Sequence, residues 1–253
     1  MDYTSLIGST KESHELIRSI PLDSRVIAVG ADPIPALMLT AYEHINPGLK
    51  LVAVCTEAND VYGLIESQNP STAIICADLE SGDGITLACE LKNKFTDLRL
   101  MLIGRSLRHE PYIPLWRGDC EVIALRQRSG GGRLFKAFHT LFVGGSYCDP
   151  YLQELLLKTC KRRKLQTPTI TSREIDIILA LVSGLSNSAI SLRLHLSEDT
   201  VKKYISVLLD KLNCQNRCQL ATRALRLGLC SWGMASSGDD LLPDLKPVNA
   251  DYS

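Results

Sequence analysis

Residues 170–228 read ITSREIDIILALVSGLSNSAISLRLHLSEDTVKKYISVLLDKLNCQNRCQLATRALRLG, and this stretch decides the fold of the C-terminal part of the chain. Its apolar residues recur at the three- and four-residue spacing of amphipathic helices, and it contains no β-rich run. Residues that favour helix N-caps precede the first three helical segments, and glycine or asparagine marks three helix ends. The pattern therefore predicts a purely helical domain of four helices over residues 170–232.

The first two predicted helices are short and well delimited. The first begins at Thr171 or Ser172 and ends near Gly184. Its predicted buried stripe consists of Ile175, Ile178, Leu179 and Val182. Ser186 or Asn187 is expected to cap the second helix, because a side-chain oxygen at that position can accept from a free backbone N–H.

The third predicted helix is longer, follows a tight turn and begins after Ser197, and the fourth runs from about residue 217 to 227. The apolar stripe of the third helix is Val201, Ile205, Leu208 and Leu212. Its opposite face is polar and carries Asp199, Lys202, Lys203, Ser206 and Asp210. Two helices joined by a tight turn, the second with a basic free face, form a helix-turn-helix. A helix about 10–12 Å across fits the major groove of DNA.

Four short motifs fall in order along this stretch: T-x-R-E, G-L-S-N, L-S-E-x-T-V-K and K-L-x-x-x-N-R. Together they resemble the DNA-binding domain of LuxR/FixJ-type (NarL-like) response regulators. The resemblance implies a domain that binds double-stranded DNA as a homodimer. It implies that Lys202, Lys203 and Ser206 face bases or nearby phosphates. The residues it implies to touch mainly the DNA backbone are Asn187, Thr200, Lys211 and Arg217. Tyr204 and Ser191 depart from the residues common in the family, and these departures bear on the DNA sequence recognised.

The part of the chain upstream of this domain alternates β-rich runs with amphipathic stretches. The runs are RVIAV (25–29), LVAVC (51–55), TAIICA (72–77), LRLMLI (98–103) and CEVIAL (120–125). The amphipathic stretches lie near 34–46, 57–68, 84–95, 107–117 and 132–143. Continuous apolar runs, each followed by a helix, predict a doubly wound parallel α/β sheet of the (βα)5 type.

The predicted organisation has five parts, and charge is unevenly divided among them. They are an N-terminal extension (1–24), the α/β domain (25–144), a linker with one helix (145–169), the helix-turn-helix domain (170–232) and a disordered tail (233–253). The net charge is zero, but residues 1–157 carry −5, residues 158–226 carry +8 and residues 227–253 carry −3. The strongly basic segment is a candidate anion-binding module.

Composition excludes several classes of protein. No apolar run approaches the roughly 20 residues of a membrane span, and no secretory signal is present. Nine cysteines, an odd number, favour free thiols in a reducing compartment, so a cytoplasmic location without membrane association is expected. Cys214 and Cys218 have metal-like spacing but lack partner ligands. No nucleophile–base pair is evident, and the sequence predicts no enzyme, no metal site and no cofactor.

The α/β part resembles the receiver domain of response regulators over roughly residues 25–144. Such a receiver needs carboxylates that hold Mg²⁺, an aspartate that accepts the phosphoryl group, a Ser/Thr and a Lys. The positions that correspond to these groups are Gly30 and Ala31, Cys76, Gly104 and Leu125. The nearest carboxylates, Asp32 and Asp78, lie one and two residues late.

Because four parts of the phosphorylation site are missing or displaced, we expect a degenerate receiver (a pseudo-receiver) that acts without aspartate phosphorylation. Two alternatives remain open. The chain could be a conventional two-component regulator that uses Asp78 with Asp32 as a partial metal site, or a protein-binding adaptor that has lost DNA binding. RNA polymerase and a signalling protein are candidate partners of the regulator. The input signal (redox, ligand or protein), the operator and the sign of regulation stay open.

Overall fold

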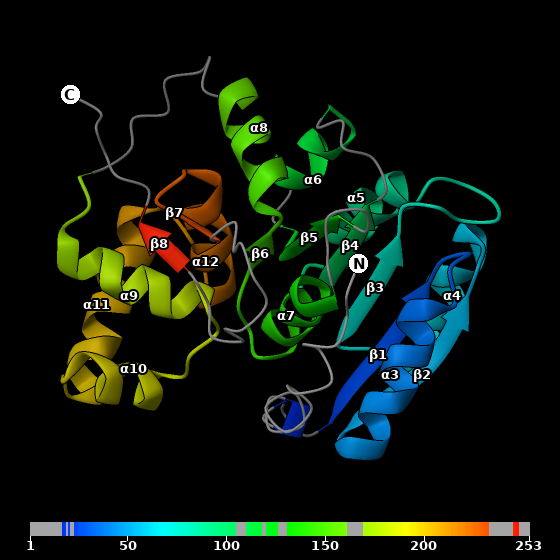
Figure 1. Cartoon of the computed structure of the whole chain (residues 1–253), viewed down its shortest axis with the longest axis horizontal. Helices are drawn as coiled ribbons and strands as arrows, with labels where there is room; N and C mark the ends of the chain where they lie inside the picture. The colour runs from blue at the N-terminus through cyan, green and yellow to red at the C-terminus, as the bar shows by residue number, and fades with distance from the viewer. Residues whose placement is uncertain are drawn as a thin grey trace.

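The structure, a computed structural model, describes residues 17–18, 20, 23–104, 110–117, 120–125, 131–160, 169–232 and 245–247. Within these residues the N-terminal part forms one parallel sheet of six strands in the order β2-β1-β3-β4-β5-β6 (Figure 1). The strands are β1 (Ser24–Val29), β2 (Leu49–Cys55), β3 (Thr72–Cys76), β4 (Arg99–Gly104), β5 (Val122–Leu125) and β6 (Tyr147–Cys148).

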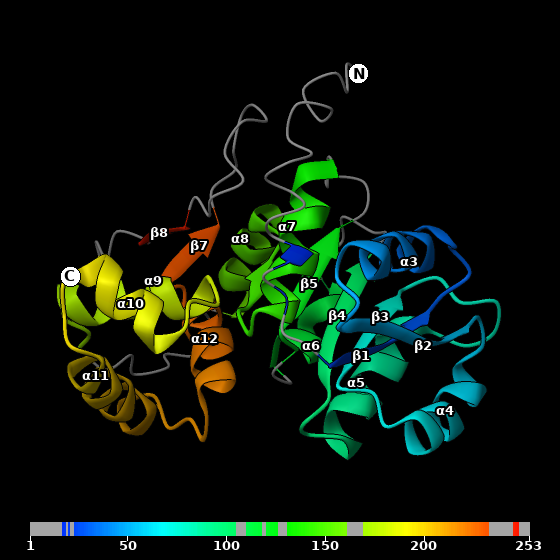
Figure 2. The same ribbon diagram turned by 90° about the horizontal axis from the view of Figure 1, so that it is seen from below.

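Helices cover both faces of this sheet (Figures 1 and 2). They are α3 (Ile34–Ile45), α4 (Val61–Gln68), α5 (Gly84–Lys94), α6 (Ile113–Arg117) and α7 (Gly131–Phe142), with 3₁₀ turns at Ala58–Asp60 and Glu110–Tyr112. On one face, Tyr42 of α3 packs edge-on against Phe135 and Phe138 of α7. On the other face, the Tyr62 hydroxyl of α4 donates to Glu90 of α5 at 2.7 Å. The predicted doubly wound α/β class is confirmed.

Burial on both faces explains the continuous apolar runs of the central strands. Every residue of β3 and of β5 is buried, as expected for a parallel sheet between two helical layers. The predicted fifth run began at residue 120, but β5 begins at Val122. The Glu121 carboxylate accepts a hydrogen bond from the backbone N–H of Leu100 at 2.8 Å. It also forms an ion pair with Lys92 at 2.7 Å. The Glu121 side chain therefore pairs with the Leu100 N–H of β4 in place of a backbone carbonyl, just before β5 begins.

The predicted linker at 145–169 contributes directly to the sheet, which the sequence analysis did not anticipate. Tyr147 and Cys148 form β6, which pairs in parallel with Val122 and Ile123 of β5. Gly144, at φ +85°, allows the sharp turn between α7 and this strand. The helix predicted in the linker is α8 (Pro150–Cys160), which follows β6 as a sixth strand–helix unit.

The four predicted helices of the C-terminal part are present and capped. They are α9 (Ser172–Val182), α10 (Asn187–Leu194), α11 (Glu198–Lys211) and α12 (Arg217–Arg226). Thr171 and Glu174 form a capping box at the start of α9, and Ser186 and Ser197 cap α10 and α11. The helix ends use left-handed residues, with Gly184 at φ +84° and Gly228 at φ +68°.

The buried face of α9 differs from the predicted stripe. Ile178 and Val182 are buried as expected, but Ile175 and Leu179 are only half-buried. The additional buried residues are Ile177, Ala180 and Leu181. The reason is that α9 contacts not only α11 and α12 but also β7 (Cys230–Trp232) and β8 (Leu245–Pro247). A helix enclosed from several sides does not show a single apolar stripe.

The two parts of the chain are joined by a set of buried contacts among β6, α8, α12 and β7, which we call the domain joint (Figures 1 and 2). The hydroxyls of Ser146 and Thr222 lie 2.9 Å apart. The Gln153 side-chain amide donates to the carbonyls of Leu225 and Cys230 at 2.9 and 2.8 Å. These partners are 72 to 77 residues apart in the chain, and they place α12 against the α/β part.

Both ends of the chain depart from the predicted organisation where they are described. Ile17 and Ile20 of the predicted N-terminal extension are buried, and the Asn46 side chain donates to both of their carbonyls. Leu245–Pro247, within the predicted disordered tail, forms β8 antiparallel to β7, which ends at Trp232 in the region predicted to be purely helical. The rest of the tail lies outside the described residues.

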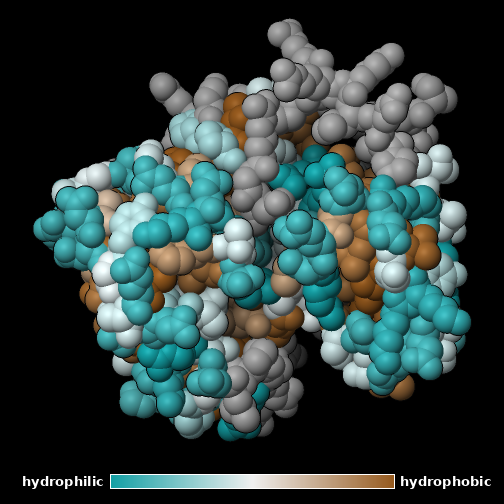
Figure 3. Space-filling model, turned by 180° about the vertical axis from the view of Figure 1, so that it is seen from behind, coloured by the Kyte–Doolittle hydropathy of each residue, from teal (hydrophilic) through white to brown (hydrophobic). Residues whose placement is uncertain are grey.

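The face seen from behind shows two lobes with a hollow between them, largely hydrophilic and with separate apolar patches on each lobe (Figure 3). No helix in the described ranges has both the length and the apolar character required to cross a membrane.

Candidate nucleic-acid interface and receiver edge

The helix-turn-helix is formed by α10, a short turn and α11. His195 adopts the left-handed conformation at φ +52° and ends α10, and Leu196 follows it. Ser197 then begins α11, with its hydroxyl accepting from the backbone N–H of Thr200 at 3.1 Å. The sequence therefore determines the turn through two local signals, one residue that tolerates a positive φ and one N-cap.

The face of α11 that carries the predicted base-contacting residues is open to solvent. Lys202, Lys203 and Ser206 are all exposed. The opposite face is buried through Val201, Ile205, Leu208 and Leu212, as predicted. α11 lies on the outer side of the helical domain, away from the sheet (Figures 1 and 2). The described residues of the domain joint therefore do not cover this face.

Lys211, predicted to touch the DNA backbone, is already engaged within the protein. Its ammonium lies 2.9 Å from both carboxylate oxygens of Glu174, which is buried in the capping box of α9. Burial of the Glu174 carboxyl raises its pKa, but the hydrogen bonds from Lys211 and Thr171 outweigh burial and hold that pKa below its usual value. Lys211 thus ties α11 to the start of α9.

The other residues predicted to contact the DNA backbone are also buried in part or hydrogen-bonded within the domain. The Arg217 guanidinium is half-buried and donates to the carbonyl of Leu185 between α9 and α10. The Thr200 hydroxyl lies 2.8 Å from that of Ser197. Asn187 is half-buried at the first position of α10, and its side-chain oxygen is buried without a hydrogen-bond partner among the described residues. A structural role therefore exists for Lys211, Arg217 and Thr200 beside the predicted one.

At the carboxyl edge of the sheet, Gly30 and Cys76, the positions predicted for the acidic pair and for the acceptor, lie next to each other. A Cβ atom added to Gly30 would lie 2.5 Å from the Cβ of Cys76 and 2.8 Å from its sulfur. Cys76 is buried at the end of β3. The two residues are complementary in size, because the cysteine side chain occupies the space that a side chain at residue 30 would need.

Bulky buried side chains also occupy the ends of β4 and β5. A Cβ atom added to Gly104 would lie 2.3 Å from the hydroxyl oxygen of Tyr112. Tyr112 is fully buried, so its ring fills the space beside the position where a receiver has Ser or Thr. Leu125, at the position predicted to correspond to the receiver lysine, is also fully buried. The neighbouring Ser106 and Arg126 lie outside the described residues.

The two carboxylates nearest to this edge have other surroundings. The Asp32 side chain accepts a hydrogen bond from the backbone N–H of Ile34 at 3.1 Å, which forms a local turn before α3. Asp78 is exposed beyond the end of β3, and its backbone carbonyl accepts from Ala31 at 3.1 Å. Asp83 caps α5 through the N–H of Thr86 at 2.8 Å. In the described part of the chain, no three His, Cys, Asp or Glu side chains are grouped so that they could hold a metal ion.

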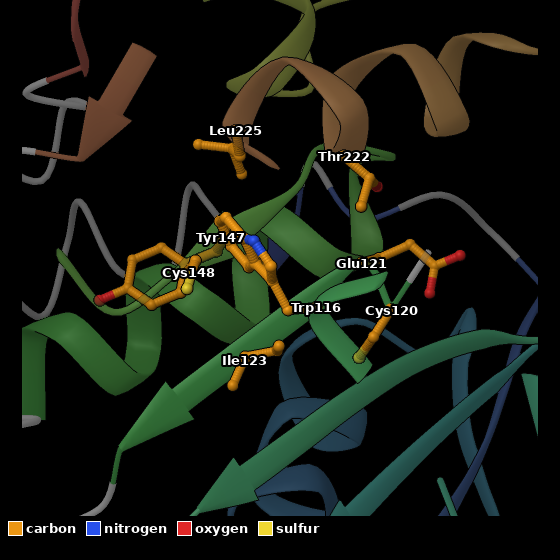
Figure 4. Close-up of a pocket in the computed structure, with 8 residues that line it drawn as sticks. All are labelled: Trp116, Cys120, Glu121, Ile123, Tyr147, Cys148, Thr222 and Leu225. Carbon is orange, nitrogen blue, oxygen red and sulfur yellow. The ribbon is translucent and has the colours of Figure 1, made fainter. Parts of the chain in front are cut away.

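A small cavity of about 10 Å³ lies where α12 meets α6, β5 and β6 (Figure 4). Figure 4 shows Thr222 and Leu225 extending from α12 toward Trp116 and Tyr147. The remaining lining residues are Cys120, Glu121, Ile123 and Cys148. The cavity has room for a single water molecule and for no larger ligand. Burial raises the pKa of both cysteine thiols, which disfavours the reactive thiolate.

Comparison with known proteins agrees with this geometry. The family model described as bacterial regulatory proteins, luxR family, matches residues 168–224. The activator DevR/DosR of Mycobacterium tuberculosis is 26% identical over 185 residues, which cover 72% of this chain and 85% of that protein. The nitrate/nitrite response regulator NarL of Escherichia coli is 22% identical over 179 residues, covering 69% of this chain and 82% of that one.

Among solved structures, the RcsB response regulator of Salmonella typhimurium has a TM-score of 0.47 at 18% identity, covering 78% of this chain and 96% of RcsB. The helical domain of this chain is thus similar, over residues 168–224, to the luxR family of bacterial regulatory proteins. Over about 70% of its length the chain is similar to proteins named as a DNA-binding transcriptional activator and as a response regulator.

Two residues of these sites escaped the sequence analysis. Val207 is exposed on the polar face of α11. A helical wheel of α11 would have placed this valine on the polar face, and this was the only signal for it in the sequence. Tyr112 fills the edge of the sheet from a connection whose path the sequence does not reveal. The contacts of Tyr112 depend on tertiary packing, so no local signal could have found them.

Proposed function

We propose that this chain is a DNA-binding transcription regulator that inserts α11 into the major groove of double-stranded DNA. One observation carries the proposal: α11 presents Lys202, Lys203 and Ser206 to solvent on the face opposite its buried stripe. Side chains at the start of such a helix reach base edges, while lysines neutralise phosphates. The charge of +8 over residues 158–226 supports an anionic partner.

The predicted homodimer is part of this proposal. DNA sites of helix-turn-helix dimers are spaced by one helical turn, so two copies of α11 would contact two half-sites. A cytoplasmic location, with RNA polymerase or a signalling protein as a further partner, completes the proposed role.

The test is binding of the full chain to duplex DNA over a range of salt concentrations. Log affinity should fall with log salt, with a slope of about −0.9 for each phosphate contact. Lys202→Ala and Lys203→Ala should each lower affinity by about tenfold, since a good contact contributes about 1–3 kcal/mol. Lys50→Ala, which removes an exposed lysine from β2, is the matched control and should leave binding unchanged. Wild-type affinity that ignores salt, or two silent α11 variants, would show that this face does not bind DNA.

We further propose that the α/β domain is a degenerate receiver that acts without aspartate phosphorylation. Cys76 and Tyr112 occupy the space beside Gly30 and Gly104, where a phosphorylated receiver has polar groups. Mg²⁺ requires several oxygen ligands in near-octahedral geometry, and Asp32 and Asp78 alone provide few. A cysteine thiol at the acceptor position forms no acyl phosphate.

Incubation with acetyl phosphate and Mg²⁺, followed by intact-mass measurement, tests this second proposal. The mass should stay unchanged. A phosphoryl adduct that disappears in Asp78→Asn would instead support the conventional regulator that uses Asp78, a possibility that the names of its response-regulator relatives keep in view. The adaptor alternative is tested by the DNA experiment, because an adaptor that has lost DNA function would bind no duplex.

A further inference from the structure

Val207 is an apolar side chain placed on the polar face of α11. It is 52% exposed and follows Lys203 by one helical turn, so the two side chains are neighbours on the same face. Ser206 and Asp210, which also lie on this face, are exposed as well. Val207 is therefore surrounded by polar groups and lies apart from the core of the domain.

Folding does not explain a valine at this position. The buried stripe of α11 runs through Ile205 and Leu208, and Val207 is not part of it. Valine has a lower helix propensity than the straight-chain residues common at exposed positions, because its β-branched side chain loses rotamer freedom in a helix. An exposed valine on this helix therefore contributes little to the stability of the domain.

The major groove offers one apolar group to a side chain on an inserted helix, the C5-methyl group of thymine. We propose that Val207 contacts a thymine methyl and so helps to determine which DNA sequence is bound. This inference rests on the proposed function, since it requires α11 in the major groove. Lys203, one turn earlier, would hold the neighbouring phosphate or base edge, which fixes the register in which Val207 meets the base.

The experiment begins with selection of a high-affinity duplex from a random library by the full-length chain. Each thymine of the selected half-site is then replaced in turn by deoxyuridine, which lacks only the C5-methyl group. For the wild-type chain, one replacement per half-site should lower affinity by about fourfold, the factor expected for burying one methyl-sized group. In Val207→Ser, affinity for the thymine duplex should fall by a similar factor, and the difference between thymine and uracil should disappear.

Leu192→Ser is the matched control, because Leu192 is the other large exposed apolar side chain of the described helical domain, 78% exposed but on α10. It should retain the full preference for thymine over uracil. The inference is overturned if the wild-type chain binds all uracil-substituted duplexes as tightly as the parent, or if Val207→Ser keeps the preference. Failure to enrich any duplex would instead refute the proposed function itself, and this inference with it. Thermal unfolding of both variants should match the wild type, which excludes loss of folding as the cause.

Discussion

Gly30 and Cys76 constrain each other at the end of the sheet. Their separation leaves no space for a side chain at residue 30 while the cysteine stays in place. Placing an acidic residue at position 30 would therefore require a coordinated change at residue 76, because its side chain would collide with Cys76. The same argument applies at Gly104, where the fully buried Tyr112 ring would have to move.

A single methyl group tests this contact. Gly30→Ala should lower the free energy of unfolding by about 1–3 kcal/mol, the usual cost of overpacking. Gly63→Ala in α4 is the control, since nothing lies within 4 Å of the added Cβ. That control should raise stability by about 0.5–1 kcal/mol through helix propensity. Urea unfolding measures both, and a Gly30→Ala protein as stable as the wild type would mean that the edge is loosely packed.

His139 of α7 gives the stability of the α/β part a dependence on pH. Burial lowers its pKa from 6.5 to about 4. The unfolded chain therefore binds a proton between these values that the folded chain does not, so stability is present above pH 6.5 and is lost as pH falls toward 4. His139→Gln should show a smaller loss of melting temperature than the wild type between pH 7 and pH 4.5. Parallel losses in the two proteins would contradict this assignment.

At the scale of elements, α5 is tied to β4 and β5 by a buried ion pair. Lys92 and Glu121 have side chains only 6% and 8% exposed, and the Lys92 ammonium also donates to the carbonyl of Leu98 at 3.1 Å. The network satisfies both charges inside the protein, and removal of one partner leaves the other buried and uncompensated.

Lys92→Met should therefore lower the free energy of unfolding by about 3–5 kcal/mol. Lys94→Met, two residues away, is the matched control. Lys94 pairs with Glu66 at 3.3 Å on the surface, where both side chains are more than half exposed. Its loss should cost less than about 1 kcal/mol. Equal effects of the two substitutions in chemical denaturation would argue against the buried pair.

The sequence predicted elements well where their signals are local. The caps at Ser186 and Ser197 and the left-handed stop at Gly184 depend on one or two neighbouring residues, and each lies where it was predicted. The buried face of α9 was predicted less well, because strands from the end of the chain cover residues that a lone helix would expose. The strand β6 was missed because two residues carry too little pattern to reveal a parallel partner.

In the candidate DNA-binding site too, features with local sequence signals were predicted, and features that depend on tertiary packing were not. Exposure of Lys202 and Lys203 follows from the helical period of α11, which the sequence displays. The engagement of Lys211 by Glu174 joins residues 37 positions apart and depends on how α9 and α11 cross. Periodicity says nothing about such a pair, so the two lysine environments could not be told apart from the sequence.

At the scale of the whole molecule, the domain joint couples the two parts of the chain. The buried Gln153 side chain donates to the carbonyl of Leu225 at the end of α12 and to that of Cys230 beyond it. The Trp232 indole donates to the carbonyl of Ser146 at 3.1 Å. Shared burial of this kind predicts that both parts unfold in one cooperative transition.

Calorimetry tests this coupling. The wild-type chain should show a single transition, and Gln153→Leu should lower its stability by about 1–3 kcal/mol for each carbonyl left unpaired. The variant should also broaden or split the transition as the two parts separate. Gln215→Leu, at an exposed position between α11 and α12, should change stability by no more than about 0.5 kcal/mol. Two transitions in the wild type would show that the joint does not couple the parts.

The domain joint also has a consequence for exchanging parts between chains. Besides α9, α11 and β7, α12 packs against β6 and α8, which precede the helix-turn-helix in the chain. A hybrid protein that received the helix-turn-helix alone would leave Leu225 and Trp232 without their covering surface. The transplantable unit therefore includes β6 and α8, and a graft that starts at α9 divides a continuous apolar interior.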